Sequence, residues 1–204
     1  MQKIVAELRR RDVDLAGMRA LEVFGYTGER LTRHYAPFVK SLEIWELDPA
    51  HESTLRQNFP RAEVRIVDSY EQVRRTKSKY DFVVIDNHIT PEEHFDLFPH
   101  IFTLLSESSV LMVLVAADAN ARVRRLHPDI FNAQHLEQRR VFYRTQHPER
   151  VPLAELALHY RTLASENGFD VDWHFFRNRR LLPVATGYYD LLLKLRLRDR
   201  DKDE

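Results

Sequence analysis

Residues 21–28, with the sequence LEVFGYTG, combine a short apolar run with two glycines, and this segment constrains the fold more than any other. The apolar run predicts a buried strand, and the glycines predict a tight turn from which a helix starts. The next apolar run, residues 42–48, ends in Glu46 and Asp48. Glycines let the backbone approach a ligand at a helix N-terminus, and an acid at the second strand tip can accept hydrogen bonds from both ribose hydroxyls. This pairing therefore predicts a site for a nucleoside.

Apolar runs and amphipathic segments alternate through the first half of the chain. Strands are expected at residues 20–25, 41–47, 63–67, 80–85 and 109–115. Helices are expected at residues 1–15, 28–39, 48–59, 70–77 and 94–105. Repeated β-α units of this kind predict a parallel sheet with helices on both faces.

The last quarter of the chain departs from this alternation. Residues 152–166 predict a helix that ends at Asn167 and Gly168, and two strands follow at 171–176 and 188–195 with no helix between them. A link without a helix is typical of an antiparallel strand pair. We therefore expect an α/β fold in which a parallel sheet, flanked by helices, is closed by a C-terminal antiparallel β-hairpin.

Length and composition limit the class of protein. A chain of 204 residues with 44% hydrophobic side chains suits one sizeable core, so a single domain over residues 1–204 is expected. Basic and acidic residues balance at 31 each, which argues against nonspecific nucleic-acid binding. The absence of cysteine excludes disulfides, zinc–thiolate sites and thiol nucleophiles. No apolar run is long enough to cross a bilayer, and no signal-peptide pattern is present, so a cytoplasmic protein without membrane or nucleic-acid partners is predicted.

A basic insert, residues 119–150, follows the fifth predicted strand, at the side where open α/β sheets bind ligands. Its seven arginines are Arg122, Arg124, Arg125, Arg139, Arg140, Arg144 and Arg150. One interpretation is a lid whose guanidiniums bind a phosphate or carboxylate of a substrate. The other is a solvated helical segment or a homodimer contact, with Phe131, Phe142 and Tyr143 as apolar anchors. Three further arginines are expected to reach the same rim: Arg177, Arg179 and Arg180.

The layout and the acids at the strand tips resemble the class I S-adenosylmethionine-dependent methyltransferases, which have a Rossmann-like sheet closed by an antiparallel last strand. The first motif of that family reads acid-x-Gly-x-Gly-x-Gly, and Glu22 and Gly28 match its two ends. Phe24 and Tyr26 stand at the first two glycine positions, and Gly25 is one place out of the usual register. These aromatic side chains can fill the space of the cofactor's methionine tail, or Tyr26 can fold over that tail as a lid.

The resemblance implies S-adenosylmethionine as the cofactor. The cofactor-binding residues that it implies are Glu22, Phe24, Gly25, Tyr26, Thr27, Gly28, Glu46, Leu47, Asp68, Ser69 and Asp86. Glu46 matches the acid that holds the ribose, and Asp68, with Ser69 beside it, matches the acid that meets the adenine amino group. Asp86 matches the acid that ends the fourth strand beside the site of methyl transfer. Acids at strand ends are also common helix caps, which is the alternative role for each of them.

The residues that follow the fourth strand are the expected place for chemistry. Methyl transfer needs an acceptor atom in line with the sulfonium methyl and, for a hydroxyl, a base that removes the proton. His88 is the candidate base because its unperturbed pKa lies near neutrality, and Asn87 is expected to orient the acceptor. Alternatively, His88 is a loop residue that helps to cap the next helix. His94, at the start of that helix, is a second histidine that can face the pocket.

The resemblance therefore implies a methyltransferase that moves a methyl group to an oxygen, or a nitrogen, of a small molecule bearing a phosphate or carboxylate. Oxygen is favoured because the chain lacks the Asn/Asp-Pro-Pro-aromatic motif of many amino-methylating enzymes. No metal is expected in this interpretation, but a magnesium-dependent O-methyltransferase would use Asp86, Asp118 and Asn120 as oxygen ligands. A catalytically silent methyltransferase-like protein would fit the altered glycine turn, and a nicotinamide-binding enzyme would fit Gly25-x-x-Gly28.

Overall fold

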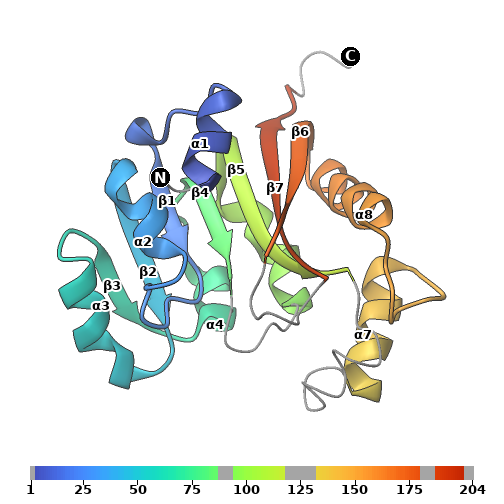
Figure 1. Ribbon diagram of the computed structural model, residues 1–204, viewed down its shortest axis with the longest axis horizontal. Coiled ribbons are helices and arrows are strands. Elements are labelled where there is room, and N and C mark those ends of the chain that lie inside the picture. The colour runs from blue at the N-terminus through green and yellow to red at the C-terminus, as the bar shows by residue number, and fades with distance from the viewer. Residues whose placement is uncertain (1–2, 87–93, 118–131, 180–186, 200–204) are drawn as a thin grey trace. The chain divides into compact units, whose positions relative to one another are not determined.

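The computed structural model describes residues 3–86, 94–117, 132–179 and 187–199 (Figure 1). Its strands form a seven-stranded sheet in the order β3-β2-β1-β4-β5-β7-β6. The chain folds into two compact units. Unit 1 comprises Met1–Ile85 and Thr103–Ser109, and unit 2 comprises Asp86–Phe102 and Val110–Glu204. The expectation of one domain over the whole chain stays a prediction.

Unit 1 is built on four strands that run parallel to one another. They are β1 (Arg19–Glu22), β2 (Ser41–Glu46), β3 (Glu63–Ile66) and β4 (Tyr80–Ile85). β1 pairs with both β2 and β4, and β2 pairs with β3. The register places Glu22 beside Ile44 and Glu46 beside Ile66, so the carboxyl ends of β1, β2 and β3 meet at one edge. The parallel arrangement predicted for these strands is confirmed.

The helices of unit 1 are short, and predicted acids cap two of its helical segments. They are α1 (Lys3–Arg10), α2 (Thr32–Tyr35), α3 (Glu52–Asn58) and α4 (Ser69–Arg75), with 3-10 turns η1 (Leu15–Gly17), η2 (Ala36–Phe38) and η3 (Pro49–His51). The carboxylates of Asp48 and Asp68 each accept a backbone N–H two residues further on, at 2.8 Å. These bonds satisfy donors that the first helical turn leaves unpaired. Asp48 therefore caps its segment as predicted.

The predicted helix at 28–39 is wrong at its start, because the helix begins at Thr32. The predicted helix at 94–105 is a series of single turns, η4 (Phe95–Leu97), α5 (Phe98–Ile101) and η5 (Phe102–Leu104). β5 (Leu105–Ala116) starts four residues earlier than predicted.

In its described part, unit 2 contains the C-terminal hairpin, most of β5, the short α5 and two longer helices. β6 (Phe169–Asn178) and β7 (Tyr188–Leu197) pair antiparallel, as predicted, with an irregularity between Val171 and Trp173. α8 (Leu153–Glu166) packs on β6 and ends before Gly168, which has a φ of +83°. α7 (Ala133–Tyr143) lies in the basic insert. No helix in the described segments is long and apolar enough to cross a membrane.

Candidate functional site

The turn that follows β1 depends on its two glycines. The Gly25 N–H donates to the Trp45 carbonyl oxygen at 2.8 Å, and a Cβ on Gly25 would lie 2.4 Å from the Ile44 side chain. Gly28 has a φ of +66°, and a Cβ there would lie 2.2 Å from the Phe59 ring. Only glycine combines this backbone freedom with such close approach. The turn is therefore held against β2 and the end of α3.

Glu46, the last residue of β2, fixes the other side of this turn. One carboxylate oxygen accepts the Tyr26 N–H at 2.5 Å, and the other accepts the Asp48 N–H at 2.8 Å. Tyr26 has a φ of +45°, in the left-handed region that side chains rarely adopt, and its ring packs edge-on against His51 at 4.4 Å between centroids. A carboxylate has about four lone-pair sites, so these two bonds leave Glu46 able to accept hydroxyl donors.

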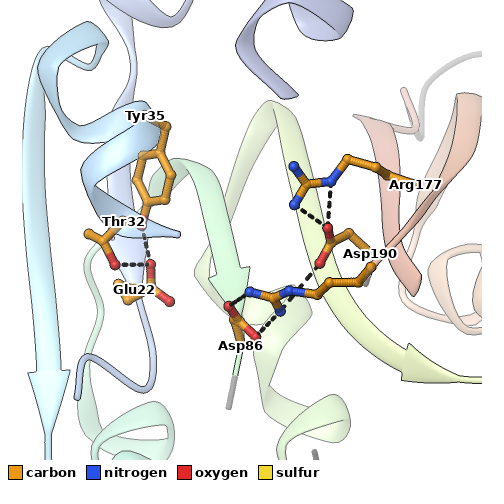
Figure 2. Close-up of polar contacts among 7 residues, drawn as sticks. Glu22, Thr32, Tyr35, Asp86, Arg177 and Asp190 are labelled. Carbon is orange, nitrogen blue, oxygen red and sulfur yellow. Dashed lines mark hydrogen bonds and ion pairs between the residues drawn. The ribbon is translucent and has the colours of Figure 1, made fainter. Parts of the chain in front are cut away.

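Glu22, at the end of β1, is buried beneath α2 (Figure 2). One of its oxygens accepts hydrogen bonds from the Tyr35 hydroxyl and, at 3.1 Å, from the Thr32 hydroxyl. The residue is 1% exposed, so these donors replace the water that a carboxylate would otherwise require. Glu22 therefore joins α2 to β1, and its assignment to the cofactor stays a prediction.

The tip of β3 is joined to the end of β1. The buried Ser69 hydroxyl donates to the Val23 carbonyl oxygen, while the Asp68 side chain is exposed and accepts the Tyr70 N–H. The Phe24 ring lies 6.1 Å from the Tyr70 ring. The residues assigned to the adenine edge therefore lie close to the turn assigned to the methionine tail, within unit 1.

Leu47 and Thr27 complete the predicted set in unit 1. Leu47 directly follows β2 and is 66% exposed, which is unusual for a large apolar side chain next to a buried strand. The Thr27 carbonyl oxygen accepts a hydrogen bond from the Asn58 side chain at 3.0 Å.

Unit 2 contains a chain of buried ion pairs that begins at Asp86, directly after β4 (Figure 2). The Arg179 guanidinium donates to both Asp86 oxygens, one at 2.6 Å, and lies 3.4 Å from an oxygen of Asp190. Arg177 donates to the other Asp190 oxygen at 2.6 Å. Asp86 and Asp190 are 1% and 0% exposed. Two carboxylates and two guanidiniums thus neutralise one another in the interior of unit 2.

Within this group of ion pairs, burial has the largest effect on the pKa of Asp190. Desolvation raises the pKa of Asp190, while Arg179 and Arg177 act in the opposite direction. The sequence reasoning missed this cluster and assigned both arginines to a substrate rim. Asp190 was the available signal, because it is the single acid in the apolar run of β7.

Two histidines of unit 2 are buried and uncharged at neutral pH. Burial lowers the pKa of His94 to about 4, with Asp86 raising it and His135 lowering it further. Burial alone lowers the pKa of His135, on α7, to about 4. A group with so low a pKa is a weak base near pH 7, so the structure does not favour His94 over His88 as the proton acceptor.

The described part of the basic insert packs as a helix. The fully buried Arg139 donates from Nε to the Pro148 carbonyl oxygen at 2.6 Å, and its guanidinium lies 5.3 Å from the Tyr143 ring centroid. Burial lowers the pKa of Arg139. Phe142 and Tyr143 stack with aromatic rings and imidazoles of α5, α8 and the turn before α5: Phe95, Phe98, His159 and Tyr160. These contacts all lie within the chain, so the homodimer contact stays a prediction.

Several predicted residues lie outside the described part of the chain: Asn87, His88, Asp118, Asn120, Arg122, Arg124, Arg125, Phe131 and Arg180. Both catalytic candidates are among them. Within the described residues, no group of three or more His, Cys, Asp or Glu side chains is placed to hold a metal ion. The magnesium alternative depends on Asp118 and Asn120, and of its three ligands only Asp86 is described.

Comparison with solved structures identifies the architecture. The N-methyltransferase NodS from Bradyrhizobium japonicum WM9 superposes with a TM-score of 0.57 at 14% identity, over 97% of this chain and 96% of NodS. M. jannaschii TYW2, in complex with AdoMet, gives a TM-score of 0.55 at 14% identity over 97% and 78% of the two chains. This chain has the class I methyltransferase fold. Ribosomal protein L11 methylase from Lactobacillus delbrueckii subsp. bulgaricus gives 0.53 at 12% identity, over 97% and 79%.

The predicted Rossmann-like sheet with its C-terminal hairpin is therefore confirmed. At these identities the likeness concerns the methyltransferase fold alone. No protein-family model matches the sequence, and comparison with curated proteins finds no significant relative.

Proposed function

We propose that this chain is an S-adenosylmethionine-dependent methyltransferase. The observation that carries the proposal is the class I methyltransferase fold with Glu46 at the tip of β2, where its carboxylate keeps free acceptor capacity beside the glycine turn. TYW2 was crystallised with AdoMet and NodS with S-adenosyl-L-homocysteine, which supports a cofactor of this class.

The residues of unit 1 fit the cofactor's parts by their chemistry. Glu46 would accept the ribose hydroxyls, and Leu47 would give the adenine an apolar face, since covering a side chain that is 66% exposed is favourable. Asp68 and Ser69 would meet the adenine edge. The turn from Gly25 to Gly28, with Phe24, Tyr26 and Thr27, would border the methionine tail. When bound, S-adenosylmethionine supplies an electrophilic methyl group.

The proposed acceptor is an oxygen, or a nitrogen, of a small molecule with a phosphate or carboxylate. Asn87 would orient this acceptor and His88 would take its proton. The absence of the Asn/Asp-Pro-Pro-aromatic motif supports oxygen, and the arginine-rich insert supports an anionic molecule. The bidentate bond from Arg179 would hold the Asp86 carboxylate in a fixed position after β4.

Calorimetry with S-adenosylmethionine and S-adenosylhomocysteine tests the proposal. We expect saturable binding with a dissociation constant on the order of micromolar. Glu46→Gln should weaken it by about 10- to 100-fold, because hydrogen bonds to a charged acceptor contribute more than those to a neutral one. Glu63→Gln is the matched control, because Glu63 is exposed and is the first residue of β3, away from the carboxyl ends of the strands. This variant should bind both ligands like the original chain.

A catalytically silent methyltransferase-like protein is the second candidate. The aromatic residues at positions 24 and 26, and the left-handed backbone at Tyr26, favour it because both alter the glycine turn. Absence of heat with both ligands at millimolar concentration would support this candidate and contradict the enzyme. Including a nicotinamide dinucleotide among the ligands tests the third alternative, a nicotinamide-binding enzyme.

A further inference from the structure

Unit 1 has a hollow of about 300 Å³ whose lining includes none of the residues assigned to the cofactor. It is lined by Arg33 of α2, by η2, by the start of β2, and by the end of α3 with the segment that follows it. Its lining is largely apolar and includes the buried Phe59 and the exposed Pro37 and Pro60. The volume is about ten times that of one water molecule in the liquid, which is enough for a small organic molecule.

Three cationic side chains line this hollow: Arg33, Lys40 and Arg61. They come from α2, from the link before β2 and from the link before β3, so the fold brings them together from separate parts of the sequence. The lining contains no aspartate or glutamate. Three like charges at one hollow repel each other and attract an anion.

These cations differ from several arginines of the same unit. Arg11, Arg56 and Arg65 each pair with a glutamate, at 2.7–3.1 Å. In the described part of the chain, by contrast, no ion pair or side-chain hydrogen bond involves the cationic groups of Arg33, Lys40 or Arg61. Their charge is therefore available to a ligand.

We propose that this hollow binds a small organic phosphate. The phosphate oxygens would lie against the three cations, and an apolar or aromatic body would lie on Phe59 and the two prolines. The hollow is larger than an inorganic phosphate needs, and its apolar lining would be left uncovered by that ion alone.

The hollow shares no lining residue with the proposed cofactor site, although Asn58 and Phe59 of its lining contact Thr27 and Gly28. It lies far from Glu46, the proposed ribose acceptor. Ser41, the first residue of β2, lines the hollow, whereas Glu46 ends the same strand. A five-residue step along a strand spans about 16 Å. The inference therefore does not depend on the proposed methyltransferase activity.

Amide NMR of the full chain during titration with phenyl phosphate tests the proposal. The probe carries a phosphate monoester and an aromatic body, while inorganic phosphate and phenol each lack one of these parts. We expect saturable shifts at Val39, Lys40 and Ala62, which line the hollow, and weaker binding of each partial probe. Shifts that are absent, that do not saturate, or that are equally strong with inorganic phosphate would overturn the proposal.

Variants that remove one positive charge provide a second test of phosphate binding. Arg33→Gln and Arg61→Gln should each weaken phenyl phosphate binding by about fivefold, the upper range for an exposed ion pair. Arg74→Gln, an exposed arginine on α4, is the matched control and should leave binding unchanged. Equal weakening by all three variants would mean that the probe senses only net charge, which also overturns a specific site. The amide spectra show directly that each variant is folded.

Discussion

Asp86→Asn should destabilise unit 2 strongly, because it removes one charge from the buried chain of ion pairs. Asparagine keeps the size of the side chain but cannot accept both guanidinium bonds as a charged group. Arg179 is 9% exposed, so water cannot compensate for the lost carboxylate. In this variant, Asp190 is the one remaining carboxylate that faces the guanidiniums of Arg177 and Arg179.

Removal of one partner from a buried ion pair typically costs about 3–5 kcal/mol. We expect the lower end, about 3 kcal/mol, because Asp190 stays 3.4 Å from Arg179 and still faces it. The double variant Asp86→Asn, Arg179→Gln should be more stable than the sum of the single changes by about 1–2 kcal/mol, because it leaves neither group unpaired.

Urea unfolding followed by tryptophan fluorescence measures this effect. The chain has two tryptophans, Trp45 in β2 and Trp173 in β6, so a Trp45→Phe background reports on unit 2 through Trp173. With a urea dependence of about 2 kcal/mol per molar, Asp86→Asn should lower the midpoint by about 1.5 M.

The control for this prediction is Glu137→Gln, which breaks a pair with Arg140 in unit 2 that is well exposed on both sides. Exposed pairs of this kind contribute little to stability, so the midpoint should hardly move. A loss below 1 kcal/mol for Asp86→Asn, or a double variant that is as unstable as the sum, would refute the reasoning.

Three further changes test other parts of the structure by unfolding measurements. Gly25→Ala should lose about 1–3 kcal/mol because its Cβ would overlap a neighbouring side chain, while Gly17→Ala, with open space around it, should be close to neutral. Tyr35→Phe removes a donor from the buried carboxylate at the end of β1 and should lose about 1.5–3 kcal/mol. Because the pKa of His94 and of His135 is about 4 in the folded state and 6.5 ordinarily, the unfolded chain binds more protons below pH 6.5. Stability should therefore be constant above pH 7 and fall from pH 6.5 toward pH 4, less steeply in His135→Phe; a flat profile would contradict this burial.

The architecture could be predicted from the sequence because local patterns of apolar and polar residues indicate the alternation of strands and helices. The apolar run at 80–85 matches β4 residue for residue, and the link without a helix correctly predicted the antiparallel hairpin. Boundaries failed where packing decides them. Val23 is buried like a strand residue but lies in the turn after β1, and that turn delays α2 to Thr32.

The candidate site was predictable only where the contacts are local. Asp48 and Asp68 cap the segments that follow them, and both were assigned to strand tips from the sequence. The bond between Asp86 and Arg179 joins residues 93 positions apart, and no local pattern reveals it. The bond from Tyr26 to Glu46 depends on a left-handed backbone that the sequence gives no reason to expect.

Amide NMR during titration with S-adenosylhomocysteine tests the central claim most directly. Glu46 holds the N–H groups of Tyr26 and Asp48, so a ribose bound to this carboxylate must change the surroundings of both amides. We expect these two signals to shift and saturate together, along with the signal of Leu47, which lies between Glu46 and Asp48 in the sequence. Saturable binding that leaves both signals unmoved, or no binding at millimolar ligand, would contradict it.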